Sequence, residues 1–182
     1  MIFEPITVKD KLGRDVVIRN AQLQDCEILI DYMKVTSAQT PFLLREPDEI
    51  TLTMEEEKSF VQGKIDAERE LMLCAFVDGK LAGNAALMNH LSFKRYQHRC
   101  DVAVALYQEY WSCGIGRTLL EKVLEAAKKA GYEQAELNVV EGNEKAISLY
   151  KKLGFTECGK IPRSMKYPDG SYRDEFVMVK EL

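Results

Sequence analysis

The sequence predicts a single domain of the mixed α/β class, with helices packed on a mostly antiparallel sheet. Three observations support this fold class. Short β-rich runs alternate with longer segments whose apolar residues recur at helical spacing. One strongly amphipathic segment stands between two β-rich runs, as expected for a crossover helix that joins two strands of one sheet. No linker, repeat or long charge block divides the 182 residues, so we expect one domain over residues 1–182.

The N-terminal part of the chain predicts a β-hairpin and then two helices. These elements are expected at residues 6–8, 16–19, 23–37 and 54–68. The two hairpin strands flank a turn at residues 11–14. Thr53 and Glu56 have the spacing of a capping box, in which both side chains accept hydrogen bonds from free N–H groups at a helix start. This pair therefore marks the beginning of the second helix.

The remainder of the chain predicts six strands and two further helices. The strands are expected at residues 71–77, 80–89, 99–106, 135–140, 155–161 and 172–180. Apolar residues from Ile115 to Ala130 form a stripe at helical period, and Gly131 ends that helix. Asn143 is suited to cap the last helix, which runs to about Leu153.

Charge and cysteine content argue against several classes of protein. Twenty-five Lys and Arg against 29 Asp and Glu give a net charge of −4, so nucleic acid is not expected as a partner. Five widely spaced cysteines and two histidines form no cluster, which argues against a disulfide framework and against a metal site. No leader pattern and no long apolar run is present. We expect a cytoplasmic protein that binds neither membrane nor metal.

The most informative segment joins the strand at residues 99–106 to the amphipathic helix. Gly114 and Gly116 lie where the first helical N–H groups have no helical partner and where the helix dipole is positive. Such a turn can hold a phosphate, although a plain tight turn explains the glycines equally well. Two common nucleotide fingerprints fail, because a third glycine is replaced by Leu119 and no Gly-Lys-Ser/Thr follows.

Two segments together resemble the GCN5-related N-acetyltransferase (GNAT) superfamily. The first is Tyr110-Trp111-Ser112-Cys113-Gly114-Ile115-Gly116, similar to the family's pyrophosphate loop, and the second runs from Asn138 to Phe155. The resemblance implies a twisted, mostly antiparallel sheet of about six to seven strands with about four helices. It departs from the family at Trp111, because the position three residues before the first glycine is usually Gln or Arg.

The resemblance also implies an activity. The expected function is direct transfer of an acetyl group from acetyl-CoA to a primary amine of a small molecule or a peptide N-terminus. A catalytically inactive acetyl-CoA-binding sensor and a protein lysine acetyltransferase are the alternatives. A homodimer is an open alternative to a monomer.

Residues for acetyl-CoA follow from matching positions in the family. The pantetheine arm is expected to pair with the backbone of Val104, Ala105 and Leu106. The pyrophosphate is expected on the backbone N–H groups of Ser112, Cys113, Gly114, Ile115, Gly116 and Arg117. Asn143 matches a cofactor-binding position. Arg117 could equally be a solvated helix-start residue, Cys113 a small filler and Asn143 a plain helix cap.

Two positions are implied to be catalytic. Tyr150 matches the family tyrosine that donates a proton to the departing thiol, and its alternative role is a core aromatic residue. Asn138 stands where some members carry a glutamate base; asparagine cannot accept a proton at neutral pH but can orient water or the amine. Glu136 is a weaker candidate for the base, with a solvated edge carboxylate as the alternative.

The acceptor side is the least defined part of the site. Arg163, Tyr172 and Asp174 are candidates to border it, with ordinary hairpin positions as their alternative. Because no carboxylate base is obvious, an amine of moderate pKa suits the site: an α-amine near about 7.7–8.0 is far more often neutral at pH 7 than a lysine near about 10.4.

Overall fold

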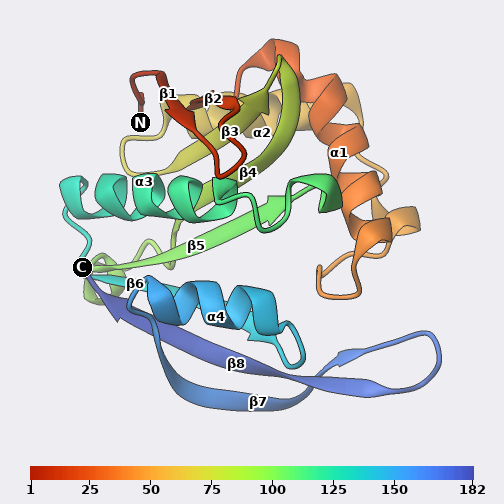
Figure 1. Ribbon diagram of the computed structural model, residues 1–182. Helices are drawn as coiled ribbons and strands as arrows, with labels where there is room; N and C mark the ends of the chain where they lie inside the picture. The colour runs from red at the N-terminus through yellow and green to blue at the C-terminus, as the bar shows by residue number, and fades with distance from the viewer.

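The computed structural model describes all 182 residues and contains one eight-stranded sheet (Figure 1). Its strands are β1 (Ile6–Lys9), β2 (Asp15–Asn20), β3 (Leu71–Val77), β4 (Lys80–Asn89), β5 (Arg99–Leu106), β6 (Gln134–Val140), β7 (Thr156–Lys166) and β8 (Tyr172–Glu181). Its α-helices are α1 (Cys26–Gln39), α2 (Met54–Asp66), α3 (Ile115–Lys129) and α4 (Glu144–Lys152). The expectation of four helices is confirmed. The sheet has more strands than the six to seven expected, because both strands of the N-terminal hairpin join it through the pairing of β2 with β3.

The strand order is β1-β2-β3-β4-β5-β6-β8-β7, and every neighbouring pair except one is antiparallel. The exception is β5 and β6, which are parallel and joined by α3, so the amphipathic helix is the crossover that the sequence predicts. This parallel pairing is short. It comprises only Arg99 with Gln134, Cys100 with Ala135 and Asp101 with Glu136.

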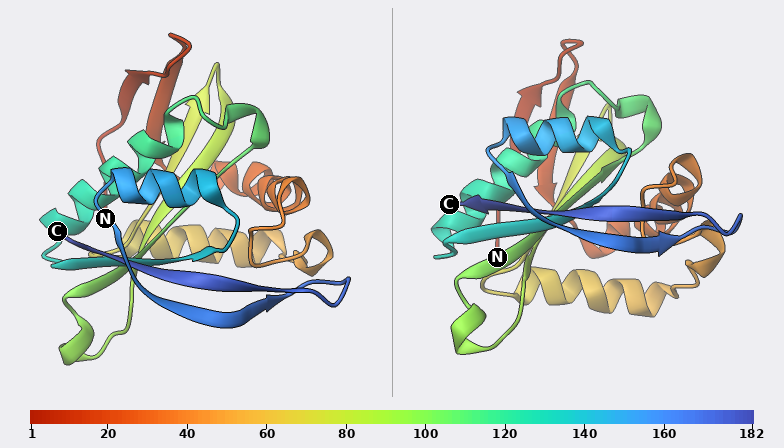
Figure 2. Two further views of the ribbon diagram at one scale, coloured as in Figure 1. Left: turned by 60° about the horizontal axis from the view of Figure 1, so that its bottom comes forward. Right: turned by 90° about the horizontal axis from the view of Figure 1, so that it is seen from below.

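The helices cover the two faces of the sheet in pairs (Figure 2). The apolar sides of α3 and α4 pack on one face, through residues such as Leu119, Leu120 and Ile147, and form the larger core. On the other face, α1 and α2 pack through Leu29 and Val61 over β3 and form a smaller core. None of the helices combines the length and the apolar character that crossing a bilayer requires.

Two predicted elements differ from the structure. The predicted first helix begins with a 3-10 turn at Leu23–Asp25, and α1 itself starts at Cys26 and continues to Gln39. The predicted strand 155–161 is longer, since β7 runs on to Lys166 through an irregular register near Pro162. Proline lacks a backbone N–H but is tolerated in an edge strand, and β7 is the edge of the sheet. The longer β7–β8 hairpin reaches the side of the domain where the α1–α2 connection lies (Figure 2).

Candidate functional site

The site begins where β5 and β6 stop pairing. Beyond Asp101 and Glu136 the two strands exchange no register partners, although both continue, β5 to Leu106 and β6 to Val140. We call the unpaired stretches, residues 102–106 of β5 and 137–140 of β6, the β5–β6 split. On its β5 side lie Val104, Ala105 and Leu106, all half-buried. Their backbone edge is therefore available to an extended ligand.

The loop after β5 presents a run of free backbone donors. The N–H groups of residues 112–117 donate to no protein acceptor, and the first helical bond is made by Thr118 N–H to the carbonyl of Gly114, at 3.1 Å. Ser112 and Gly114 both have positive φ, +64° and +92°, which turns the chain sharply into α3. The loop thus combines free donors with the positive end of a 15-residue helix.

Gly116 is required by close packing at this loop. A Cβ atom on it would lie 2.9 Å from Cδ1 of Leu106 and 3.9 Å from side-chain atoms of Val104 and Leu149. The first turn of α3 consequently lies directly against the end of β5 and against α4. Ile115 and Cys113 are buried beside it, as a core residue and a small filler.

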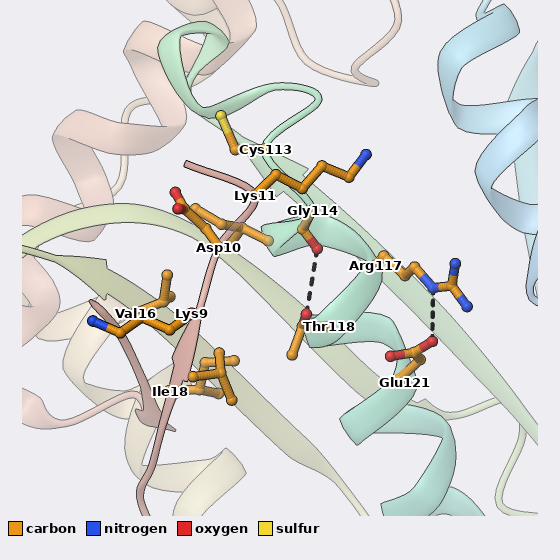
Figure 3. Close-up of a pocket in the computed structure, with 12 residues that line it drawn as sticks. Lys9, Asp10, Lys11, Val16, Ile18, Cys113, Gly114, Arg117, Thr118 and Glu121 are labelled. Atoms are coloured by element: carbon orange, nitrogen blue, oxygen red, sulfur yellow. Dashed lines mark hydrogen bonds and ion pairs between the residues drawn. The ribbon is translucent and has the colours of Figure 1, made fainter. Parts of the chain in front are cut away.

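The N-terminal hairpin supports the loop from outside. Lys11 N–H donates to the carbonyl of Cys113 at 2.9 Å, and the Lys11 side chain lies across Gly114, 3.4 Å from where its Cβ would be. A cavity of about 390 Å³ lies between the hairpin and α3, and Lys11 and Arg117 stand on its rim (Figure 3). Arg117 is exposed and pairs with Glu121 at 2.8 Å, one turn along α3. Sequence reasoning missed Lys11, because nothing local relates that turn to a loop a hundred residues later.

Trp111 has a structural role at the position where the family usually has Gln or Arg. Its indole N–H donates to the carbonyl of Leu106 at 2.9 Å, which fastens the loop to the end of β5. The Lys145 ammonium, on α4, lies 5.1 Å from the centre of its ring. One acceptor position on Leu106 is thereby taken, so Val104 and Ala105 are the freer residues for backbone pairing.

Tyr150 and Asn143 belong to α4. Tyr150 is buried against Phe155, with ring centroids 5.9 Å apart. Its hydroxyl has no hydrogen-bond partner in the protein. Burial raises the pKa of Tyr150 to about 12. The Asn143 side chain accepts a hydrogen bond from Ala146 N–H at 3.4 Å, so it caps α4, and its amide N–H₂ group remains free. Asn143 can therefore cap the helix through its side-chain oxygen and, at the same time, donate a hydrogen bond to a ligand through its side-chain nitrogen.

Glu136 differs from both readings made from the sequence. It is buried, on a strand with neighbours on both sides, and so is not a solvated edge carboxylate. The Arg99 guanidinium binds both of its oxygens, the Nη2 to Oε2 contact being 2.6 Å, and Gln134 donates to it at 2.9 Å. The hydrogen bonds from Arg99 hold its pKa below the usual range, which makes it a poor base. Asn138, two residues on, is exposed on the same face.

A second polar pair lies at the start of the split. His90 Nδ1 lies 3.0 Å and 3.1 Å from the two carboxylate oxygens of Asp101, and the Tyr96 ring stacks on the imidazole at 5.8 Å. Asp101 is the last β5 residue paired with β6. His90, Asp101 and Glu136 each place one atom that could ligate a metal ion within 4.8 Å of the others. The Arg99 guanidinium, however, already binds the carboxylate of Glu136.

The alternation of side chains along β8 shows which face of the sheet carries each residue proposed to border the amine substrate. On β8, Val177 pairs with Asn138, so odd-numbered residues share the face of Asn138 and even-numbered ones face α4. Tyr172 and Asp174 therefore lie on the opposite face from Asn138, and Asp174 pairs with Lys160 at 2.7 Å. Arg163 is exposed and lies over the Tyr172 ring at 4.0 Å. Arg173 is the β8 cation on the Asn138 face, which sequence reasoning missed.

Known proteins share this architecture. The family model described as the acetyltransferase (GNAT) family matches residues 35–155. An N-alpha-acetyltransferase of Sulfurisphaera tokodaii is 28% identical over 175 residues, covering 94% of this chain and 96% of that protein. A GNAT-family acetyltransferase of Streptococcus pneumoniae has a TM-score of 0.87 at 30% identity, covering 92% and 99% of the two chains. YncA of Salmonella typhimurium, solved with its cofactor acetyl-CoA, has a TM-score of 0.81 at 20% identity, covering 92% and 94%.

The chain belongs to the GNAT acetyltransferase family. The two segments that carry the resemblance in the sequence are the loop that opens α3 and the strand and helix that follow it, β6 and α4. In the structure they lie on either side of the β5–β6 split.

Proposed function

We propose that this protein is an acetyl-CoA-dependent N-acetyltransferase that transfers an acetyl group directly to a primary amine of a small molecule or a peptide N-terminus. The observation that carries the proposal is the run of free N–H donors at residues 112–117, next to the unpaired edge of β5. The name of the Sulfurisphaera relative and the acetyl-CoA bound to YncA support the same function.

The residues present fit a pyrophosphate and a pantetheine arm. Six consecutive backbone donors at a helix start suit a doubly charged anion, and Gly114 and Gly116 leave the backbone uncovered. Lys11 and Arg117 add positive charge at the rim of the loop. Val104 and Ala105 would hold the amides of the arm as an added strand edge, and Asn143 would donate to it through its free amide.

Acetyl-CoA, when bound, supplies the acetyl group as a thioester. The protonated amine must lose one proton before its nitrogen bonds to the acetyl carbon. The carbon–sulfur bond then breaks, and the second proton that leaves the nitrogen replaces the one that Tyr150 gives to sulfur. Tyr150 donates its hydroxyl proton to the departing sulfur. With a pKa of about 12 the hydroxyl is fully protonated at neutral pH, and its lack of a protein partner leaves it free to donate. Asn138, exposed on β6, orients the amine.

The hydrogen-bonded pair of Asp101 and His90 takes the proton from the amine, and Nε2 of His90 is the atom that accepts it. Because Glu136 is neutralised by Arg99, Asp101 is the carboxylate at the start of the split that carries no cationic arginine or lysine partner. Its hydrogen bond to His90 Nδ1 fixes the imidazole tautomer when His90 is neutral, so that Nε2 can accept a proton. His90 is partly exposed and can release that proton to solvent.

Two variants at one position test whether the free N–H groups of residues 112–117 bind acetyl-CoA. Arg117→Ala removes the guanidinium alone, whereas Arg117→Pro also removes one of the six N–H donors without breaking a helical hydrogen bond, since proline is tolerated in a first turn. We expect acetyl-CoA to bind Arg117→Pro about tenfold more weakly than Arg117→Ala by calorimetry. Equal affinities, with both proteins folded by circular dichroism, would contradict the site.

Activity is tested by release of free CoA thiol with amino acids, polyamines, aminoglycosides and N-terminal peptides as acceptors. We expect turnover on at least one class, dependent on Tyr150. Tight binding of acetyl-CoA without turnover on any acceptor would identify a sensor and overturn the proposal.

A further inference from the structure

A bridge joins two distant segments above the face that carries Asn138. The Tyr167 hydroxyl, near the tip of the β7–β8 hairpin, donates to the carbonyl of Pro41, in the connection between α1 and α2, at 2.8 Å. Figure 2 shows the hairpin reaching toward that connection in both views.

Arg173 lies within the bridge and has no ionic partner. Its guanidinium lies 5.2 Å from the Phe42 ring centre and 5.2 Å from that of Tyr167, so two aromatic rings hold it. It forms no hydrogen bond or salt bridge within the protein, in contrast to Arg14, Arg19 and Arg99. The side chain is only half-exposed, so its five donors are positioned but unused.

No neighbouring carboxylate forms an ion pair with Arg173. Hydrogen bonds with Ser171, and to a smaller extent the charge of Arg173, lower the pKa of Asp169. Glu175, two residues along the same face, accepts a hydrogen bond from the Ser164 hydroxyl. Asp169 accepts from Ser171 N–H at 2.8 Å. Asp174 lies on the opposite face and pairs with Lys160. The hydrogen-bond donors of the Arg173 guanidinium are therefore left for a ligand.

The Arg173 guanidinium lies far from Asn138, the residue that we propose orients the reacting amine. Arg173 is four residues beyond Val177, the partner of Asn138, which is roughly 14 Å along an antiparallel strand. Its Nη1 lies 3.4 Å from where a Cβ of Gly142 would be, so it is also about four residues beyond Asn138 on the β6 side. The α-carboxylate of a free amino acid cannot span this separation, whereas an extended peptide covers it in about four residues.

We infer that Arg173 forms an anion-binding subsite, and that the acceptor is an extended peptide whose N-terminal amine reacts while a carboxylate at its third or fourth residue binds the guanidinium. This inference rests on the proposed N-acetyltransferase function and narrows its acceptor to acidic peptides. Phe42 and Tyr167 orient the planar guanidinium, and a carboxylate binds it through two parallel hydrogen bonds.

The experiment compares four hexapeptides of equal length that carry one glutamate at position 1, 2, 3 or 4, each with a glutamine counterpart and an amidated C-terminus. Free glutamate is assayed beside the eight peptides as a further acceptor. For the wild-type protein we expect the glutamate peptide to exceed its glutamine counterpart in kcat/KM by about tenfold at positions 3 and 4, and by much less at position 1. Free glutamate should be a poor acceptor.

Arg173→Gln should abolish the preference at positions 3 and 4, and Arg173→Lys should retain part of it. Lys129→Gln, at the far end of α3, removes the same charge and should leave the preference intact. The KM for acetyl-CoA should stay unchanged in all three variants, which shows that the fold is retained. Peptide turnover with a preference that Arg173→Gln does not alter, or a preference confined to position 1, would overturn the inference alone. Absence of turnover on every acceptor would overturn the proposed function as well.

Discussion

Lys11 N–H donates to the carbonyl of Cys113 at 2.9 Å, so the tip of the N-terminal hairpin is fastened to the loop that opens α3. The bond gives the Cys113 carbonyl a donor from outside the loop. It also places the Lys11 side chain over Gly114. A segment at the edge of the sheet therefore supports the loop at which we propose that the pyrophosphate binds.

Lys11→Ala is expected to raise the KM for acetyl-CoA about threefold to fivefold and to leave kcat unchanged. The backbone bond to Cys113 survives the substitution, so only the exposed ammonium is lost, and exposed charge interactions are individually small. Lys9→Ala serves as the control, because Lys9 pairs with Asp15. Steady-state kinetics with acetyl-CoA varied will measure the change, and an equal effect in both variants would contradict a direct contribution from Lys11.

Tyr150→Phe is expected to lower kcat by roughly 100-fold while acetyl-CoA affinity stays nearly constant. The substitution keeps the ring that packs on Phe155 and removes only the hydroxyl, which has no protein partner. Stability should therefore change little. Calorimetry and initial rates measure the two quantities, and an unchanged kcat would reject Tyr150 as the proton donor.

Asp101→Asn is expected to lower kcat/KM by about 100-fold for an acceptor amine with a pKa near 10, and by less for one near 8. The amine of lower pKa is more often neutral without assistance, so it needs the base less. Glu136→Gln is the matched control, because Arg99 already neutralises Glu136. A loss that does not depend on the amine pKa would indicate a positioning role for Asp101.

Local chemistry in the sequence was sufficient to predict the crossover helix, its glycine-rich start and the cap at Asn143. Each of these depends on residues that lie within one continuous segment, and the structure confirms them. The partner of Glu136 could not be predicted, since Arg99 lies 37 residues earlier and meets it only through the parallel register of β5 and β6. Arg173 was overlooked for a similar reason. Its face on β8 follows from pairing with Asn138, and its aromatic neighbours come from the α1–α2 connection and the β7–β8 hairpin.

Glu136→Gln should also reduce stability at pH 7, by about 1.5 kcal/mol, because the Arg99 guanidinium keeps its charge but loses the carboxylate that accepts its two hydrogen bonds. Arg99 lowers the pKa of Glu136 in the folded state, so the pair stabilises the fold fully above the unfolded pKa of about 4.3. That contribution is lost as the pH falls through the lower, folded pKa. Urea unfolding of both proteins should show a difference that narrows below about pH 4. A difference that stays constant down to acid pH would mean that the pair is not the cause.

The alkaline side of the pH profile tests the ionisation of Tyr150 directly. The pKa of an exposed tyrosine is about 10, but burial raises the pKa of Tyr150 to about 12. Since only the protonated hydroxyl can donate, kcat measured at saturating amine should remain level through about pH 10 in the wild-type protein. Samples returned from high pH to pH 7.5 before assay will separate reversible ionisation from loss of fold. A reversible fall in kcat centred near pH 10 would mean that the hydroxyl is solvated, and the buried environment described for Tyr150 would then be wrong.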